Sequence, residues 1–320
     1  MSSKTNTTGP SPAAGFRSAA ETADLSRKPR PGESVVMFLL RAAALVSVLT
    51  TVGIVVSLAL PAIDFFRQVP LMDFLTGTGW SPNFSPQSFG VLPLVSGTLV
   101  VTAIGLVVAV PFGLGAAMYL SEYASSKTRA RLKPVIELLA GIPSVVYGFF
   151  ALTFVTPVLL QGFLDLKVGY TNALSAGIVL GIMIIPTVAS LSEDAMSAVP
   201  HALRQGSFAM GANRMQTTLR VVFPAAISGI AAAIVLGLSR AIGETMIVAL
   251  AAGGQPNLAL DPREGMQTMT GYIAATSQGE NPVGSISYNT LFAVGLLLFC
   301  MTLVINMISI RLVRRYRQVY

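Results

Sequence analysis

Six long apolar stretches dominate this chain and restrict what it can fold into. They span residues Val35–Ile63, Leu92–Leu120, Val135–Leu160, Ala173–Leu191, Pro224–Gly253 and Tyr288–Ile310. A hydrocarbon core of about 30 Å takes about 20 residues of helix to cross. None of the stretches alternates like a barrel strand, and a helix satisfies its own backbone hydrogen bonds in lipid. The sequence therefore predicts an all-α polytopic membrane protein with six transmembrane helices.

Composition and charge agree with a membrane protein and predict its orientation. Only 11% of the 320 residues are charged, against about 25% in a soluble domain. Of 21 Lys and Arg residues, 17 lie in the N-terminal tail and the start of the first stretch, the loops after the second and fourth stretches, and the C-terminus. By the positive-inside rule both termini are then cytoplasmic. Because these charges are scattered over four segments, we expect no nucleic-acid surface.

The first 33 residues differ from the rest of the chain. They are rich in Ser, Thr, Pro, Gly and Ala and contain almost no large apolar residue. Such a segment cannot bury enough apolar surface to fold. We therefore expect a disordered cytoplasmic tail over residues 1–33 and a transmembrane domain over residues 34–320.

The residue types argue against an enzyme. The chain has one His, His201, and one Cys, Cys300, which is too few for a metal cluster or a His-based triad. A phosphate-binding loop needs the sequence Gly-x-x-x-x-Gly-Lys-Ser/Thr. Only Lys4 and Lys127 are followed by Thr, and neither is preceded by glycine. We expect no catalysis, metal or cofactor, so any ATP hydrolysis must occur on a partner chain.

Arg240 and Glu244 lie inside the fifth apolar stretch. An Arg at the centre of a membrane helix costs about 2.5–3.5 kcal/mol, so such a charge predicts a function. In one continuous helix, a spacing of four residues would put both groups on one face. The forked guanidinium of Arg suits a tetrahedral oxyanion. Thr245 and Ser144 complete the predicted substrate path.

Glu244 allows three interpretations. It can be a counter-ion that pairs with Arg240 when no substrate is bound. It can also select the substrate, because a carboxylate accepts a hydrogen bond from protonated phosphate but repels sulfate. In the third interpretation the pair only fixes helix packing.

Prolines and glycines indicate how the helices are shaped and packed. Pro111, Pro143 and Pro186 are expected to interrupt the second, third and fourth spans. Gly177 and Gly181 form a small-xxx-small pattern that permits close helix approach.

The loop over residues 192–223 is long enough to have its own structure. It is expected to form two short helices with a polar joint at Gly206 and Gly211 to Asn213, before Pro224 opens the fifth span, and a helix of this kind can dock into a groove on a partner protein. The run Gln205-Gly206-Ser207-Phe208-Ala209-Met210-Gly211, followed after a gap by Pro224, resembles the coupling-helix signature of ABC importer permeases. That signature is Glu-Ala-Ala-x-x-x-Gly-(nine residues)-Ile-x-Leu-Pro. Gly211 and Pro224 match it, whereas Gln205, Gly206 and Ser207 replace Glu-Ala-Ala.

Two further strings narrow the resemblance. Residues 237–246, Gly-Leu-Ser-Arg-Ala-Ile-Gly-Glu-Thr-Met, and residues 137–148, Glu-Leu-Leu-Ala-Gly-Ile-Pro-Ser-Val-Val-Tyr-Gly, are similar to segments of permeases of the phosphate-specific ABC importer. The first outer loop, with Trp80-Ser81-Pro82, resembles the PstC type. The resemblance implies a permease-like bundle in the inner membrane that imports inorganic phosphate and couples transport through residues 205–207, 210 and 211.

The same resemblance implies partners. These are a second permease of PstA type, a dimeric ATP-binding subunit of PstB type, an extracytoplasmic phosphate-binding protein of PstS type and membrane lipid. Two alternatives remain at this stage. One is an ABC permease for sulfate or molybdate, and the other is a proton-coupled secondary transporter that uses Glu244 as a relay. A signalling role alongside transport is compatible with both.

Overall fold

The computed structural model describes residues 31–279 and 281–316. The tail predicted over residues 1–33 lies almost wholly outside them, and the first helix, α2, begins at Pro31. The chain divides into two units between Ile54 and Val55, so α2 contributes to both.

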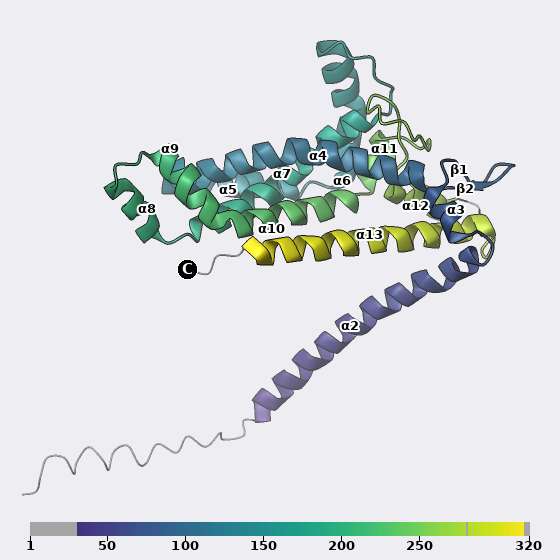
Figure 1. Ribbon diagram of the computed structural model, residues 1–320, viewed down its shortest axis with the longest axis horizontal. Coiled ribbons are helices and arrows are strands. Elements are labelled where there is room, and N and C mark those ends of the chain that lie inside the picture. Colours follow the sequence, from purple (N-terminus) through teal and green to yellow (C-terminus); the bar gives the residue numbers. More distant parts are fainter. Residues whose placement is uncertain (1–30, 280, 317–320) are drawn as a thin grey trace, which may run out of the picture. The chain divides into compact units, whose positions relative to one another are not determined.

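Six candidate membrane spans are present among the described residues, which confirms the predicted fold class (Figure 1). Their helices are α2 (Pro31–Phe66), α4 (Leu92–Met118) with the π-helical η1 (Tyr119–Tyr123), α6 (Ser144–Phe150) with η2 (Ala151–Phe163), α7 (Ala173–Ser197), α9 (Arg214–Thr217) with η3 (Thr218–Val222) and α10 (Phe223–Ile242), and α13 (Ile286–Tyr316).

Two of the predicted spans are each interrupted by a turn. The stretch Val135–Leu160 begins within α5 (Ser126–Ala140) and is broken at Gly141–Pro143, because proline disfavours helical backbone in the residue before it. The stretch Pro224–Gly253 stops at Ile242, and a separate helix, α11 (Met246–Ala251), follows. Of the three prolines expected to interrupt helices, only Pro143 does so. Pro111 and Pro186 lie inside the continuous helices α4 and α7.

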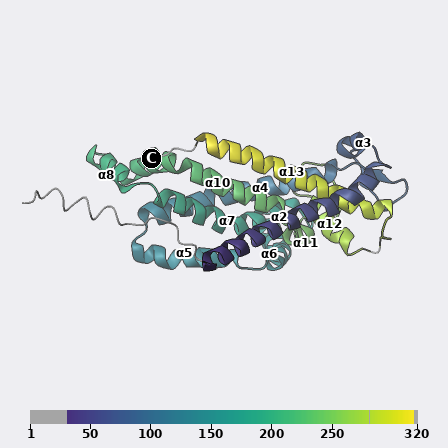
Figure 2. The same cartoon turned by 90° about the horizontal axis from the view of Figure 1, so that it is seen from below.

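The most extensive helix contact joins α4 and α7, and glycines allow it. A Cβ on Gly177 would lie 2.6 Å from Ile104 Cβ, and one on Gly181 would lie 2.7 Å from the carbonyl oxygen of Gly105. The predicted close approach is therefore confirmed. The largest apolar core forms around α7, with Leu180, Met183 and Ile184 at its centre. Figures 1 and 2 both show α13 running along α10, which it contacts.

One end of this unit is built from aromatic side chains. The short helix α3 (Leu71–Thr76), the strands β1 (Trp80–Ser81) and β2 (Ser88–Phe89), and α12 (Met269–Ser277) gather there. The strands pair antiparallel. Trp80 packs edge to face on Tyr272 at 4.9 Å between ring centroids and is buried. It is therefore a core residue and not the exposed membrane-interface anchor that an outer-loop Trp suggests.

The opposite end carries the loop predicted to be structured. The helices α8 (His201–Ala209) and α9 lie there, but Gly206 is inside α8 and not in the joint. Helix α9 continues through η3 into α10, so the fifth span begins at Arg214 and not at Pro224. The joint between α8 and α9 contains Gly211 at φ +84°, a conformation that glycine adopts without strain. Asn213 then begins α9 with a capping box, in which its side chain accepts from Gln216 N.

The glycine contact between α4 and α7 can be tested by adding one methyl group. We expect Gly181→Ala to destabilise the purified protein by about 1–3 kcal/mol, because the helices must separate to admit the new Cβ. Gly115→Ala is the matched control, since a Cβ at Gly115 meets nothing within 4 Å. Thermal unfolding in detergent measures both changes. Equal stability of the two variants would contradict close packing at Gly181.

Candidate functional site

Arg240 lies two residues before the end of α10, on an exposed position of this chain. Its Nη1 donates to Thr187 Oγ1 on α7, with 3.3 Å between the two atoms. No ion pair joins Arg240 to Glu244 in the part of the chain that the structure describes. The prediction of a counter-ion pair on one helix face is therefore wrong, because α10 ends at Ile242 and Glu244 follows the break.

Glu244 has a different partner. Its carboxylate accepts hydrogen bonds from the backbone N–H of Met246 at 3.1 Å and of Ile247 at 3.4 Å, both at the start of α11. Its own carbonyl oxygen accepts from the Thr270 hydroxyl on α12, 2.6 Å away. Glu244 thus holds the turn between α10 and α11 and ties that turn to α12.

The other two predicted path residues differ in their surroundings. The Thr245 hydroxyl donates to Gly243 O at 3.4 Å and so faces its own backbone. Ser144 opens α6, is half-buried, and makes no hydrogen bond to another described residue. Tyr147, one turn further along α6, lies near enough to Arg240 to interact with its charge. Thr245 therefore bonds to its own backbone, whereas the Ser144 hydroxyl has no partner among the described residues.

A row of polar groups extends from Arg240 along α7. Thr187, Ser190 and Asp194 are spaced at three and four residues, which puts them on one helix face. Thr187 accepts from Arg240, Ser190 donates to Glu137 at 3.1 Å, and Asp194 accepts from Lys133 at 2.5 Å. The row links the candidate anion site on α10 to the charged helix α5. Lys133 therefore pairs with α7 and not with Glu137, one turn further along its own helix.

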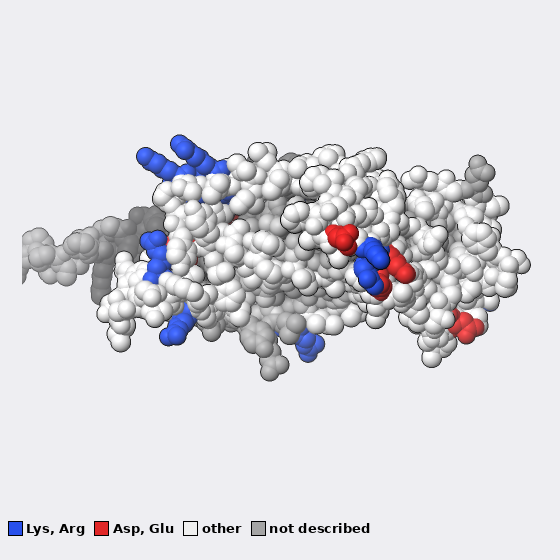
Figure 3. All heavy atoms as spheres, turned by 90° about the horizontal axis from the view of Figure 1, so that it is seen from above, with Lys and Arg blue, Asp and Glu red and all other residues white. Residues whose placement is uncertain are grey.

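A charged cluster joins α5 to α7 at the end that carries α8. The Glu193 side chain on α7 is 0% exposed and pairs with Arg129 and Lys133 of α5. Partial burial alone would lower the pKa of the Lys133 ammonium, but hydrogen bonds to Asp194 and Glu193 outweigh it and raise the pKa above its usual range. The Lys133 ammonium is therefore charged at neutral pH. Figure 3 shows Lys and Arg side chains gathered at this end on one face.

Arg204 connects α8 to two other helices. Its guanidinium pairs with Glu122 in η1, at 2.8 Å between Nη2 and Oε1, and donates to the carbonyls of Met196 and Val199 at the end of α7. The two side chains are only 11% and 7% exposed. The sequence did not predict this pair. Arg204 counted there only as one of the basic residues that indicate membrane orientation, and Glu122 lies 82 residues away.

The predicted coupling residues surround this anchor. Gln205 and Gly206 lie on exposed positions of α8, and the Ser207 hydroxyl is 2.9 Å from Thr217 Oγ1 of α9. Met210 and Gly211 form the exposed joint. The arrangement leaves one apolar surface open, with Phe208, Met210 and Met215 exposed. Such a surface on a fixed helix suits docking on a partner protein.

No group of three or more His, Cys, Asp or Glu side chains that could hold a metal is present among the described residues. Cys300 lies on α13 as a free, exposed thiol. The chemistry of the site is therefore that of one accessible guanidinium, hydroxyl groups and a network of ion pairs.

Comparisons with known proteins agree with this arrangement. The family described as "Binding-protein-dependent transport system inner membrane component" matches residues 109–318. A probable ABC transporter permease protein, YqgH of Bacillus subtilis, is 38% identical over 82% of this chain and 85% of its own length. The phosphate transport system permease protein PstC 1 of Mycobacterium tuberculosis is 35% identical over 76% of this chain and 82% of its own. PstC of Mesorhizobium japonicum is 31% identical over 84% and 86%.

Solved structures share the fold at low sequence identity. A chain of a bacterial alginate ABC transporter aligns with a TM-score of 0.63 and 18% identity, over 88% of this chain and 96% of its own. A chain of the MetNI methionine ABC transporter aligns with a TM-score of 0.53 and 21% identity, over 72% and 95%. These likenesses concern the fold alone.

The Arg204–Glu122 pair yields a stability prediction. Arg204→Gln leaves the Glu122 carboxylate buried without a cation, so we expect a loss of about 3–5 kcal/mol. The double variant with Glu122→Gln should cost less than the two single changes together. Arg67→Gln is the matched control, because the Arg67–Asp64 pair is exposed and worth at most about 1 kcal/mol. Unfolding of the purified protein measures all four variants. Additive losses would show that the pair is not coupled.

Proposed function

Because the chain belongs to the family of inner membrane components of binding-protein-dependent transport systems, we propose that it is the permease subunit of an ATP-driven importer of inorganic phosphate. As an ABC importer permease of this family, it is a multi-pass inner membrane protein, and the family excludes the proton-coupled secondary transporter. Phosphate as the substrate is supported by several relatives of 31–35% identity that are named phosphate transport system permeases.

The observation that carries the proposal is the environment of Arg240. Its guanidinium is exposed on this chain and, among the described residues, has only the Thr187 hydroxyl as a hydrogen-bond partner, so its remaining donors can bind an anion. An arginine binds phosphate oxygens through two parallel hydrogen bonds, and burial against a partner permease would strengthen them. A paired arginine, such as Arg204, could not do this.

We further propose partners and an orientation. A second permease of PstA type completes the path, a dimeric ATPase of PstB type docks on α8, and a phosphate-binding protein of PstS type delivers the substrate. Both termini are cytoplasmic, which puts α8 on the ATPase side. Catalysis of ATP hydrolysis belongs to the partner subunit.

In this proposal α7 transmits movement from the ATPase to the anion. Closure of the ATPase displaces α8, and Arg204 passes the displacement to η1 and to the end of α7. Met196 and Thr187 are nine residues apart on α7, or about 14 Å of helix at 1.5 Å per residue. The same helix that receives the push therefore holds Arg240, so the exposure of the guanidinium can change between the two sides of the membrane.

Uptake of three anions tests the substrate. The transporter, assembled from this chain and its candidate partners in liposomes, should accumulate phosphate but neither sulfate nor molybdate when ATP is supplied. We expect Arg240→Gln to reduce phosphate uptake at least about 30-fold, because losing a charged anion contact costs about 2–5 kcal/mol. Arg67→Gln, at an exposed pair, is the control. A preference for sulfate or molybdate would overturn the substrate, and retained uptake by Arg240→Gln would refute the role of Arg240.

Glu244 has a positional role in this proposal. Gln at this position retains an oxygen that can accept from Met246 and Ile247, so Glu244→Gln should leave both phosphate uptake and the rejection of sulfate unchanged. Glu244→Ala should lower stability by about 0.5–2 kcal/mol, as lost helix caps do. If Glu244→Gln instead admits sulfate, the carboxylate selects the substrate. Competition uptake with both anions distinguishes these results.

A further inference from the structure

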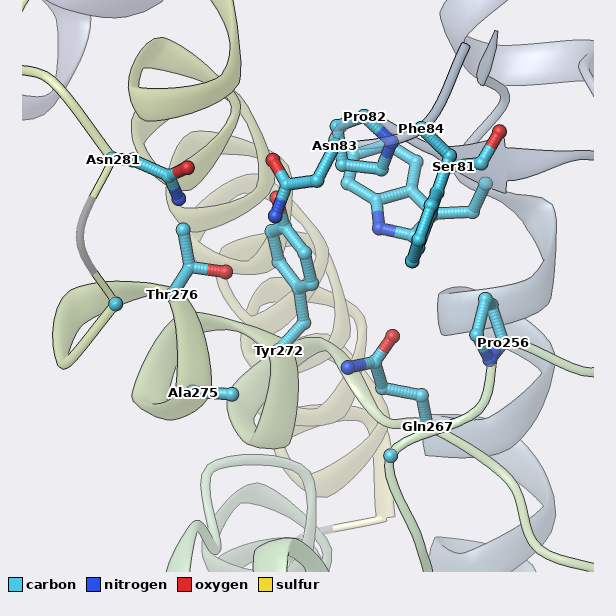
Figure 4. Close-up of a pocket in the computed structure, with 13 residues that line it drawn as sticks. Ser81, Pro82, Asn83, Phe84, Pro256, Gln267, Tyr272, Ala275, Thr276 and Asn281 are labelled. Carbon is cyan, nitrogen blue, oxygen red and sulfur yellow. The ribbon is translucent and has the colours of Figure 1, made fainter. Parts of the chain in front are cut away.

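A pocket of about 310 Å³ lies at the end of the molecule away from α8 (Figure 4). Its walls come from the turn Trp80–Phe84, from the loop that contains Pro256 and Gln267, and from α12 with the residues that follow it. Figure 4 shows Gln267, Thr276 and Asn281 around one space. In the proposed orientation this pocket lies on the extracytoplasmic side of the membrane. The anion-binding role proposed for Arg240 does not involve it.

Two polar side chains in this pocket have hydrogen-bonding groups without a partner among the described residues. Trp80 is 5% exposed, yet its indole Nε1 has no hydrogen-bond partner among the described residues. Gln267 is 8% exposed, and its carboxamide makes no hydrogen bond to another described residue. Buried donors are nearly always satisfied, so the unpaired indole of Trp80 needs an explanation. A ligand group that accepts a hydrogen bond would satisfy Trp80.

The walls around these groups are aromatic and uncharged. Tyr272 packs against Trp80, while Pro82, Phe84 and Pro256 line the remainder. Among the residues that the structure describes, no Lys, Arg, Asp or Glu lines the pocket. A free phosphate dianion would lose its hydration here without gaining a counter-charge. A peptide segment fits better, since its carbonyl can accept from the indole while an apolar side chain contacts the rings.

Exposed apolar side chains flank the pocket. Phe84 lines it, and Leu260 and Val283 lie in the adjoining segments; all three are largely exposed and outside the six candidate spans. A desolvated centre with an aromatic anchor and an apolar surround is typical of a protein interface. The pocket is also held rigid, because the Pro82 carbonyl accepts from both Ser287 and Gln87.

We propose that this pocket binds an uncharged, protruding loop of the extracytoplasmic binding protein. A carbonyl of that loop accepts from Trp80 Nε1, and its apolar side chain packs against Tyr272 and Phe84. The inference rests on the proposed function in taking the phosphate-binding protein as the partner. Docking there also reaches the anion site, because α12 contributes Tyr272 to the pocket and Thr270 to the Glu244 carbonyl.

A substitution at the mouth of the pocket tests the inference. Ala275 is exposed, lines the pocket and lies on α12, whereas Ser277 is exposed on the same helix but does not line it. In the assembled transporter, Ala275→Arg should raise the Kd for purified, phosphate-loaded binding protein at least about tenfold, and Ser277→Arg less than about twofold. Trp80→Phe keeps the ring and loses the donor, so we expect an increase of about 3–10-fold.

The failures of the two proposals are distinguishable. If the wild-type transporter binds the protein and both Ala275→Arg and Trp80→Phe leave the Kd unchanged, the pocket is not the docking site and holds only water. The proposed function would then still stand. A transporter that does not bind the phosphate-binding protein would overturn both proposals. If free phosphate at millimolar concentration binds to wild-type transporter and this binding is lost in Ala275→Arg, the pocket takes the ion and the peptide proposal is wrong.

A crosslinking experiment locates the contact directly. A photoreactive benzoylphenylalanine replacing Phe84 in the assembled transporter should crosslink to the added phosphate-binding protein. The same replacement at Phe163, which is comparably exposed at the end of η2, is the control and should not crosslink. Equal crosslinking at the two positions would contradict a specific site beside Trp80.

Discussion

The arrangement of this chain depends on the burial of α7 against α4. The glycines on both helices bring their backbones so close that Gly181 leaves no room for a Cβ. Van der Waals contact of this kind drives helix association in lipid, where burial of apolar surface gains little. Because α7 is fixed in this way, the groups that it carries have defined positions, and other helices attach to it through polar contacts.

Those contacts are arranged along α7 in an order that suits transmission. Arg240 of α10 bonds to Thr187 near the middle, α5 pairs with Glu193 and Asp194 one to two turns later, and α8 bonds to Met196 at the end. The pair that fixes α8 is nearly buried, so losing one partner costs far more than losing an exposed pair. A displacement of α8 therefore moves α7 and does not merely bend the connecting loop.

The sequence could predict the spans and the helices of the loop, but not the contacts between them. Length and apolar content identify a span, and Gly211 marks the joint after α8. The turn at Gly243–Thr245 has no such marker, because its neighbours are as apolar as those of a continuous helix, so the face shared by Arg240 and Glu244 was predicted wrongly. Arg204 and Glu122 are 82 residues apart, and only the packing of α4, α7 and α8 brings them together.

The two ends of the molecule use different chemistry because their tasks differ. At α8, charged groups are paired within the chain and buried, and such pairs resist separation once formed. At the Trp80 pocket, the described lining residues are uncharged, and the indole donor has no partner among the residues that the structure describes. A partner that must deliver its ligand and leave is better held by one neutral hydrogen bond and aromatic contacts than by a buried ion pair, because a buried charge pair slows dissociation. This difference suits the proposed linkage at α8 and the proposed reversible docking at the pocket.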